Sequence, residues 1–213
     1  MFTILQQGGP VMWLIIAGGL VALFVFTERF LHVHRAKIKT DDFVSGICNV
    51  LRRGNVEEAL SICDDTPGPA AFVVRAAIMN RDLGREMIAQ GIDNAALEEL
   101  ARIEKRFGIL ASIAQTAPLM GVLGTVIGMI QTLISIRHTS PLVQIGDLAA
   151  GLWPALLTTA AGLAVAILSY IGYNVLVSRA DSIALDMETA AVKILGFFSS
   201  EHIPGNSGTG TKQ

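Results

Sequence analysis

Three long stretches of the chain carry no charged side chain, and they constrain the fold more than any other feature. They cover residues 11–27, 108–136 and 148–178, and tyrosine is the only ionisable residue type within them. A helix needs about 20 mostly apolar residues to cross a bilayer core about 30 Å thick. The stretches therefore predict three transmembrane helices, and the second and third are long enough to tilt or to project beyond the lipid.

Composition agrees with this prediction but does not decide it. The 213 residues are 52% hydrophobic and 16% charged, whereas a soluble domain is about 45–50% apolar and about 25% charged. The first stretch resembles a signal peptide in length. However, residues 1–10 contain no Lys or Arg, and a signal peptide requires a basic segment before its apolar core. We therefore expect a retained helix.

The distribution of basic residues predicts the orientation of the chain in a bacterial inner membrane. Residues 28–107 hold twelve of the sixteen Lys and Arg residues, whereas Arg137 is alone between the second and third stretches. Basic residues concentrate in cytoplasmic segments. We therefore expect a multi-pass protein whose N-terminus is periplasmic and whose large loop and C-terminus are cytoplasmic.

The fold class expected from these features is all-α, an integral membrane protein with three transmembrane helices. The second and third helices should be long and extend into a cytoplasmic helical bundle. No helix breaker separates the amphipathic run that begins at Glu86 from the second apolar stretch, so one continuous helix is expected there. The expected segments are a periplasmic N-terminus (1–10), transmembrane helices (11–30, 108–136, 148–178), a cytoplasmic helical region (31–107), a periplasmic loop (137–147), a cytoplasmic helix (179–203) and a disordered tail (204–213).

Shorter signals organise the cytoplasmic region. Asn55, with Glu58 three residues later, is typical of a helix N-cap with a capping box. Residues 64–69, DDTPGP, form a turn that a helix cannot cross, and a helix should resume near Ala70 and end near Asp82. Cys48 and Cys63 are too far apart for a Cys-x-x-Cys motif, so we interpret them as small core residues.

Small and hydroxyl residues replace charge inside the second and third stretches. Their spacing of three and four puts them on one face of each helix, where small residues allow close helix packing. They are Pro118, Gly121, Thr125, Gly128 and Thr132 in the second stretch, and Ala155, Thr159, Gly162 and Ala166 in the third, with Thr158 beside them.

Two interpretations of these faces remain open. They pack the helices together, with threonine hydroxyls bonded to their own helix carbonyls, or the hydroxyls line a cavity at mid-depth. A hydroxyl does not relay protons by titration, and a relay needs Asp, Glu or His. Either no proton is transferred, or the acid comes from another polypeptide.

Other chemistry finds no support in the sequence. Gly121, Gly124 and Gly128 lie within an apolar helix rather than at a strand-to-helix turn, so they do not form a nucleotide-binding loop. The sequence shows no metal-ligand cluster and no nucleophile–base pair near the stretches. We therefore expect no enzyme activity, no metal and no cofactor.

Two segments resemble the signatures of the MotA/TolQ/ExbB proton-channel family. Residues 114–130, AQTAPLMGVLGTVIGMI, are similar to its second-span signature, and residues 151–166, GLWPALLTTAAGLAVA, to its third-span signature. The order of three spans and the Glu28-Arg29 pair after the first also match. The number of spans and the chain length resemble those of ExbB and TolQ more than those of MotA. The sequence PLMG at residues 118–121 is closer to ExbB than to TolQ.

The resemblance implies a homopentamer around the single transmembrane helices of an ExbD- or TolR-like partner that carries a membrane aspartate. Proton-motive force would then drive work on a TonB- or TolA-like client. By motif position, Thr125 and Thr159 match pore-facing threonines, with Thr158 beside them. The residues implied to pack against the partner helix are Pro118, Gly121, Gly128, Thr132, Ala155 and Gly162.

One position departs from the family pattern, because Pro154 stands where well-studied ExbB proteins have a glutamate. A mechanism that needs this glutamate does not apply to this chain, and the proline removes one helical hydrogen bond. The alternative function is a stand-alone small-solute or ion transporter. Such proteins usually have an intramembrane charge or broken helices, and the sequence shows neither. The client, the cargo and the choice between proton and sodium are not readable from the sequence.

Overall fold

The computed structural model describes residues 9–35, 40–139 and 145–201, and all its regular elements there are helices. The all-α prediction is confirmed. The expectations for most of the N-terminus, for part of the 137–147 loop and for the 204–213 tail concern residues outside these ranges. The chain divides into two compact units, one of residues 1–32 and 105–178 and one of residues 33–104 and 179–213. We call them the apolar unit and the amphipathic unit.

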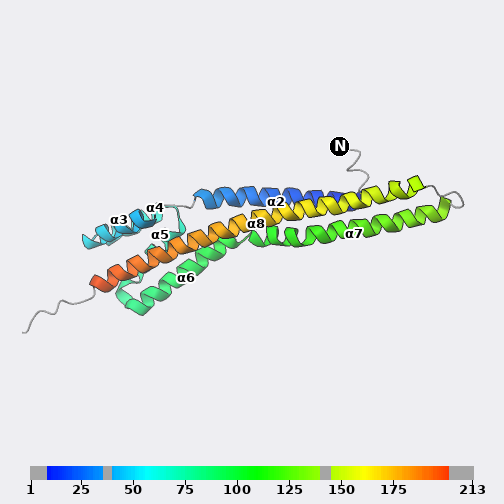
Figure 1. Ribbon diagram of the computed structural model, residues 1–213. Helices are drawn as coiled ribbons and strands as arrows, with labels where there is room; N and C mark the ends of the chain where they lie inside the picture. Colours follow the sequence, from blue (N-terminus) through cyan, green and yellow to red (C-terminus); the bar gives the residue numbers. More distant parts are fainter. Residues whose placement is uncertain (1–8, 36–39, 140–144, 202–213) are drawn as a thin grey trace, which may run out of the picture. The chain divides into compact units, whose positions relative to one another are not determined.

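The apolar unit contains the three helices predicted to cross a membrane. They are α2 (Gly9–Arg35), α7 (Phe107–Thr139) and the first part of α8 (Ile145–Glu201). Their segments Gly9–Leu31, Phe107–Arg137 and Gly151–Ser200 are long and apolar enough for a span. Figure 1 shows these three helices side by side in the apolar unit, and close contacts such as Gly19 with Val165 join them.

Small side chains lie inside the apolar unit together with some large ones such as Ile15, Leu110 and Leu176, and many other large apolar side chains lie on its outside. The buried residues include Ala22 of α2, Ala117 of α7 and Ala155 of α8. Large apolar side chains on every helix are exposed, among them Phe24, Leu119, Leu133, Leu156 and Leu168. A protein in water rarely exposes so many apolar groups together, so these surfaces face lipid or other membrane helices. The chain is therefore a multi-pass membrane protein.

The amphipathic unit is a bundle of short helices with the last part of α8. Its other elements are α3 (Thr40–Arg52), α4 (Val56–Asp65), α5 (Pro69–Met79), the 3₁₀ helix η1 (Arg81–Leu83) and α6 (Arg85–Glu104). Most of α5 is buried, including Val73, Val74 and Ile78, and Ile194 of α8 is also buried. The predicted break and the helix after it are confirmed, but the break is shorter than expected, because Asp64 and Asp65 belong to α4 and Pro69 begins α5, which ends at Met79.

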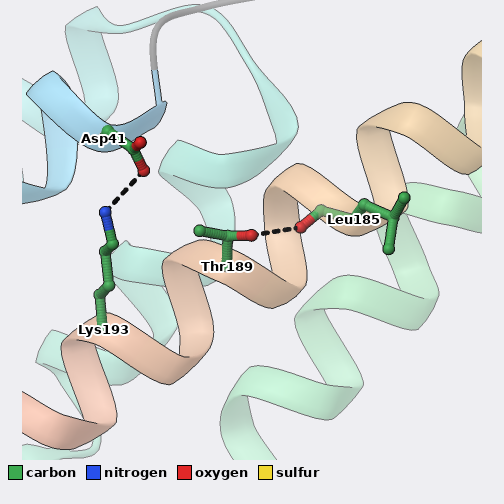
Figure 2. Close-up of polar contacts among 4 residues, drawn as sticks. All are labelled: Asp41, Leu185, Thr189 and Lys193. Carbon is green, nitrogen blue, oxygen red and sulfur yellow. Dashed lines mark hydrogen bonds and ion pairs between the residues drawn. The ribbon is translucent and has the colours of Figure 1, made fainter.

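Polar contacts join α8 to the start of α3 within the amphipathic unit. Lys193 Nζ lies 2.6 Å from Asp41 Oδ1, and Figure 2 shows this ion pair between the two helices. One turn earlier, the Thr189 hydroxyl donates to the carbonyl oxygen of Leu185 at 2.9 Å. The prediction that the third span continues as a helix into the charged C-terminal segment is confirmed, because α8 is unbroken from Ile145 to Glu201.

The prediction of one continuous helix from Glu86 into the second span is wrong. Helix α6 ends at Glu104 and α7 begins at Phe107, with a turn at Lys105 and Arg106. Arg106 forms an ion pair with Glu28 of α2, and the boundary between the two units falls between residues 104 and 105. No proline marks this break. The break falls beside a tertiary contact, the ion pair of Arg106 with a side chain far away in the sequence.

The Asn55 prediction is confirmed in position but not in detail. Asn55 is the N-cap of α4, yet its side chain makes no capping bond to the backbone. Instead, Asn55 Nδ2 donates to Glu58 Oε2 at 3.0 Å. The two residues of the expected capping box therefore bond to each other. The preceding Gly54 has a φ of 80°, a left-handed conformation that glycine adopts without steric cost where α3 ends.

Candidate functional site

The candidate site is the contact between α7 and α8, which we call the α7–α8 seam. At its centre the two backbones touch. A Cβ atom added to Gly162 would lie 2.6 Å from the carbonyl oxygen of Ala117, and one added to Gly121 would lie 3.0 Å from the Cα of Thr159. Backbone atoms cannot move aside as a flexible side chain does. Only glycine therefore fits at position 162, and a Cβ atom at position 121 would require the facing backbone to shift.

The seam continues away from this centre through pairs of small residues. A Cβ atom on Gly124 would lie 2.5 Å from Thr158 Oγ1, and one on Gly128 would lie 2.7 Å from the Cβ of Ala155. Near the ends of the two helices, Gly151 of α8 faces the side chain of Thr132 on α7. The predicted small faces of the two helices therefore pack against each other within one chain.

One hydroxyl joins the two helices directly. Thr159 Oγ1 donates to the carbonyl oxygen of Gly121 at 3.0 Å. By contrast, three other threonines of the seam region bond to carbonyl oxygens of their own helices. Thr125 donates to Val122 at 2.6 Å, Thr132 to Gly128 at 2.8 Å, and Thr158 to Ala155 at 2.6 Å.

The structure places the three predicted pore-lining threonines in different surroundings. Thr158 is only 2% exposed and lies against Gly124 of α7. Thr159 is half-buried and bonded to Gly121, and Thr125 is half-buried one turn after Gly121. Thr158 and Thr159 are thus covered in part by α7 of their own chain. Their role toward a second polypeptide stays a prediction.

The six residues expected to pack against a partner helix are all described. Gly121, Gly128, Ala155 and Gly162 take part in the seam, and Thr132 is packed against Gly151. Pro118 is half-buried within α7, one residue after the carbonyl that Gly162 approaches. These contacts are intramolecular, and packing of the same residues against another chain stays a prediction.

The prolines of the second and third spans lie within continuous helices. Helix α7 passes through Pro118, and α8 passes through Pro154. Because proline has no N–H, the carbonyl of the residue four positions earlier has no helical donor. For Pro154 this residue is Ala150, near the start of α8.

The sequence interpretation did not single out a cavity at one end of the seam. Its volume is about 250 Å³, and it is lined by α7, α8 and the first described turn of α2. Polar groups on its wall include Gln131, Ser135, Thr132 and Thr158. Gln131 could have been noticed as the second amide side chain within an uncharged apolar stretch. The part played by α2 could not, because it depends on tertiary packing.

The seam contains no acid or base among its described residues. The described ranges also hold no group of three or more His, Cys, Asp or Glu side chains placed to bind a metal ion. The seam can therefore pack helices, bond water or a neighbouring polar group through hydroxyls, and expose carbonyl oxygens. A titrating group at this site would have to come from elsewhere.

Comparisons with known proteins agree with this architecture. Residues 66–189 match the MotA/TolQ/ExbB proton channel family. An ExbB homologue from Methanothermobacter thermautotrophicus, described as a biopolymer transport protein, is 25% identical over 83% of this chain and 62% of its own length. An ExbB-like protein from Synechocystis is 30% identical over 81% of this chain and 68% of its own length.

A third relative is more similar over a shorter region. The biopolymer transport protein ExbB of Aquifex aeolicus is 41% identical over 100 residues, which are 47% of this chain and 64% of that protein. The chain thus spans slightly less than two thirds of two of these relatives. The family match covers more than half of the chain and includes α7, the seam and most of α8. The chain therefore belongs to the MotA/TolQ/ExbB proton channel family.

Proposed function

We propose that the chain is the ExbB-like scaffold and channel subunit of an inner-membrane motor driven by proton-motive force. In this proposal a homopentamer surrounds an ExbD- or TolR-like single-span partner, whose membrane aspartate carries the proton. The motor energises transport or an envelope process through a TonB- or Tol-like client. The N-terminus is periplasmic and the C-terminus is cytoplasmic. The names of the relatives and the family match support this class of function.

The observation that carries the proposal is a hydroxyl-bearing seam without any titrating group. The spans over residues 108–136 and 148–178 contain no Asp, Glu, His, Lys or Arg. A proton relay within a membrane requires such a group. A proton channel built from these spans must therefore obtain its acid from a second polypeptide, with Thr125 and Thr159 as hydrogen-bonding groups beside it.

The geometry supports different tasks for the proposed pore residues. Thr125 is half-buried, and its hydroxyl bonds within its own helix, to the carbonyl oxygen of Val122. Thr159 holds α7 and α8 together through Gly121. Thr158 is covered by α7 and lines the cavity described above. We assign contact with the partner's carboxyl group to Thr125 first.

Paired substitutions at Thr125 test the pore assignment. Thr125→Val removes the hydroxyl, whereas Thr125→Ser keeps it and serves as the matched control. In cells that lack the native chain, the valine variant should assemble normally but lose force-dependent transport, and the serine variant should retain most of it. Normal transport by both Thr125→Val and Thr159→Val would remove the pore assignment.

Co-purification tests the partner. The tagged chain, extracted from its own membranes in a mild detergent, should carry a small single-span protein with an aspartate inside its span. The Thr125→Val variant should retain this protein, because the contact area of a whole helix is far larger than one hydroxyl. Proton flux through the purified chain alone in lipid vesicles, with no such protein present, would refute the need for a second polypeptide.

A further inference from the structure

We infer that the cavity at the end of the α7–α8 seam is a water-filled vestibule that brings water down to Thr158, and that Gln131 organises this water. Nothing in the family match or in the relatives' names assigns a role to this cavity. The inference that the cavity holds water rests only on its volume and its lining residues. Only the use of the vestibule as the outer part of an ion route rests on the proposed function.

The cavity is large enough for several water molecules. Its volume is about 250 Å³, and a molecule of liquid water occupies about 30 Å³. An apolar cavity of this size would stay dry, but a cavity with two to four polar partners for each molecule holds ordered water. The character of the wall therefore decides what fills it.

The wall supplies both donors and acceptors. Gln131 offers an amide group, and no hydrogen bond joins it to another residue within the described ranges. The hydroxyls of Thr132 and Thr158 donate to carbonyls of their own helices, but each oxygen keeps lone pairs that accept from water. The Gln131 side chain is exposed, so its amide group is available to bond water at the wall of the cavity.

Pro154 adds an acceptor to the same wall. It lines the cavity together with Gly151, and it leaves the carbonyl of Ala150 without a helical donor. A helical carbonyl points toward the residue four positions later, so the Ala150 oxygen is directed toward Pro154, which lines the cavity. The proline therefore gives water a backbone oxygen to bond where a continuous helical ladder would offer none.

The position of the cavity connects water to the buried seam. Part of the wall is the first turn of α2, which consists of Gly9, Pro10 and Val11. The cavity therefore lies at the start of the first span. Ser135 and Gly151 mark the end nearest the α7–α8 connection, and Thr158 and Gly124 mark the end inside the seam. Thr158 has only 2% of its surface exposed, and the vestibule gives its hydroxyl a route to solvent.

Cysteine accessibility in lipid nanodiscs tests this inference. The background carries Cys48→Ser and Cys63→Ala, and the probe is a positively charged, lipid-insoluble methanethiosulfonate. Thr132→Cys and Thr158→Cys place thiols in the vestibule. Leu133→Cys and Leu156→Cys are the controls, since they lie at similar heights on the same helices but 65% and 62% exposed on the outer surface. Thiol modification requires a thiolate in contact with water.

The two vestibule cysteines should react at least about ten-fold faster than their controls, because one unit of thiol pKa changes the thiolate fraction tenfold. Adding Gln131→Leu should slow Thr158→Cys to the rate of Leu156→Cys, whereas Gln131→Asn should not. Equal rates for vestibule and outer positions would overturn the inference. If a substitution at Thr158 lowers the melting temperature, Ser135→Cys replaces it as the probe, because this substitution changes a single atom. Its labelling rate should then fall when Gln131→Leu is added, and an unchanged rate would overturn the inference.

This outcome is independent of the motor. Fast labelling together with normal transport by the Thr125→Val and Thr159→Val variants would keep the vestibule and reject the motor assignment. Slow labelling together with loss of transport in the valine variants would reject the vestibule and keep the motor assignment.

Discussion

Thr159 and Gly121 form the hydrogen bond that joins α8 to α7, with 3.0 Å between Thr159 Oγ1 and the carbonyl oxygen of Gly121. In the α-helical pattern, the same oxygen accepts from the backbone N–H of Thr125 four residues later. One carbonyl therefore connects the two threonines whose positions match the family's pore residues. Thr159 and Thr125 thus share one hydrogen-bond acceptor.

Thr159→Val should destabilise the chain slightly and abolish force-dependent transport. Hydrogen bonds between membrane helices contribute about 0.6 kcal/mol on average, and Gly121 keeps its helical donor in the variant. Thr159→Ser, which retains the donor, should stay close to the parent in both respects. Thermal unfolding in detergent and transport in cells measure the two effects. A large loss of stability with intact transport would show that Thr159 acts only in packing.

Gly162→Ala should disrupt the seam. Its new methyl group would lie 2.6 Å from the carbonyl oxygen of Ala117, and overpacking of this kind typically costs about 1–3 kcal/mol. Gly18→Ala in α2 is the matched control, because nothing lies within 4 Å of its added Cβ. Melting temperature should fall clearly for the first variant and stay level or rise for the second. Equal melting temperatures would contradict the close approach of the two helices.

Cys63 should resist alkylation at neutral pH. Burial, with a smaller contribution from Asp64, raises the pKa of the Cys63 thiol from 9.0 to about 11. Iodoacetamide at pH 8 should leave Cys63 unmodified in the native protein and should modify it after denaturation. Mass spectrometry of the digested protein measures this. Rapid modification of Cys63 in the folded chain would show that the core of α4 opens readily.

The same pKa predicts how stability changes at high pH. A thiol whose pKa is raised by folding stabilises the native state while it is protonated, and this contribution disappears as the pH rises from about 9 toward about 11. The parent should therefore lose stability over this range, and Cys63→Ala should lose less of it. Denaturant unfolding at a series of pH values tests the difference.

The ion pair between Glu28 and Arg106 should contribute little to stability. Both side chains are more than a third exposed, and exposed pairs typically contribute about 0.2–1 kcal/mol. A double-mutant cycle with Glu28→Gln and Arg106→Gln should give a coupling energy in this range that decreases with added salt. The charge reversal Glu28→Arg with Arg106→Glu should restore most of it. A coupling of several kcal/mol would mean that the pair is buried from water.

Local patterns in the sequence were sufficient for much of the fold. Absence of charge over three stretches identified α2, α7 and α8, since lipid-facing helices cannot carry unpaired ions. Pro67 and Pro69 identified the turn before α5. Sequence patterns failed at Lys105 and Arg106, where the helix ends without a breaker. The break falls beside Arg106, whose ion-pair partner Glu28 is distant in the sequence, and local patterns carry no information about such contacts.

Some features of the candidate site were likewise predictable from local sequence patterns, and others were not. Spacing of three and four placed the small residues of each helix on one face, because that spacing follows from 3.6 residues per turn. It did not reveal that Gly162 meets Ala117, that Thr158 is covered, or that the start of α2 closes a cavity over Gln131. Each of these depends on which faces of different helices meet.

By itself, the sequence determined the number of apolar helices, the small faces on two of them and the lack of any acid within the spans. These properties belong to single segments, and local periodicity and the cost of charge in lipid decide them. Only the tertiary structure decided that the small faces meet in one seam, that Thr159 bonds across it and that polar groups surround a cavity. Such features depend on shape matching between segments far apart in the chain, and side-chain volumes and backbone approach distances control that matching.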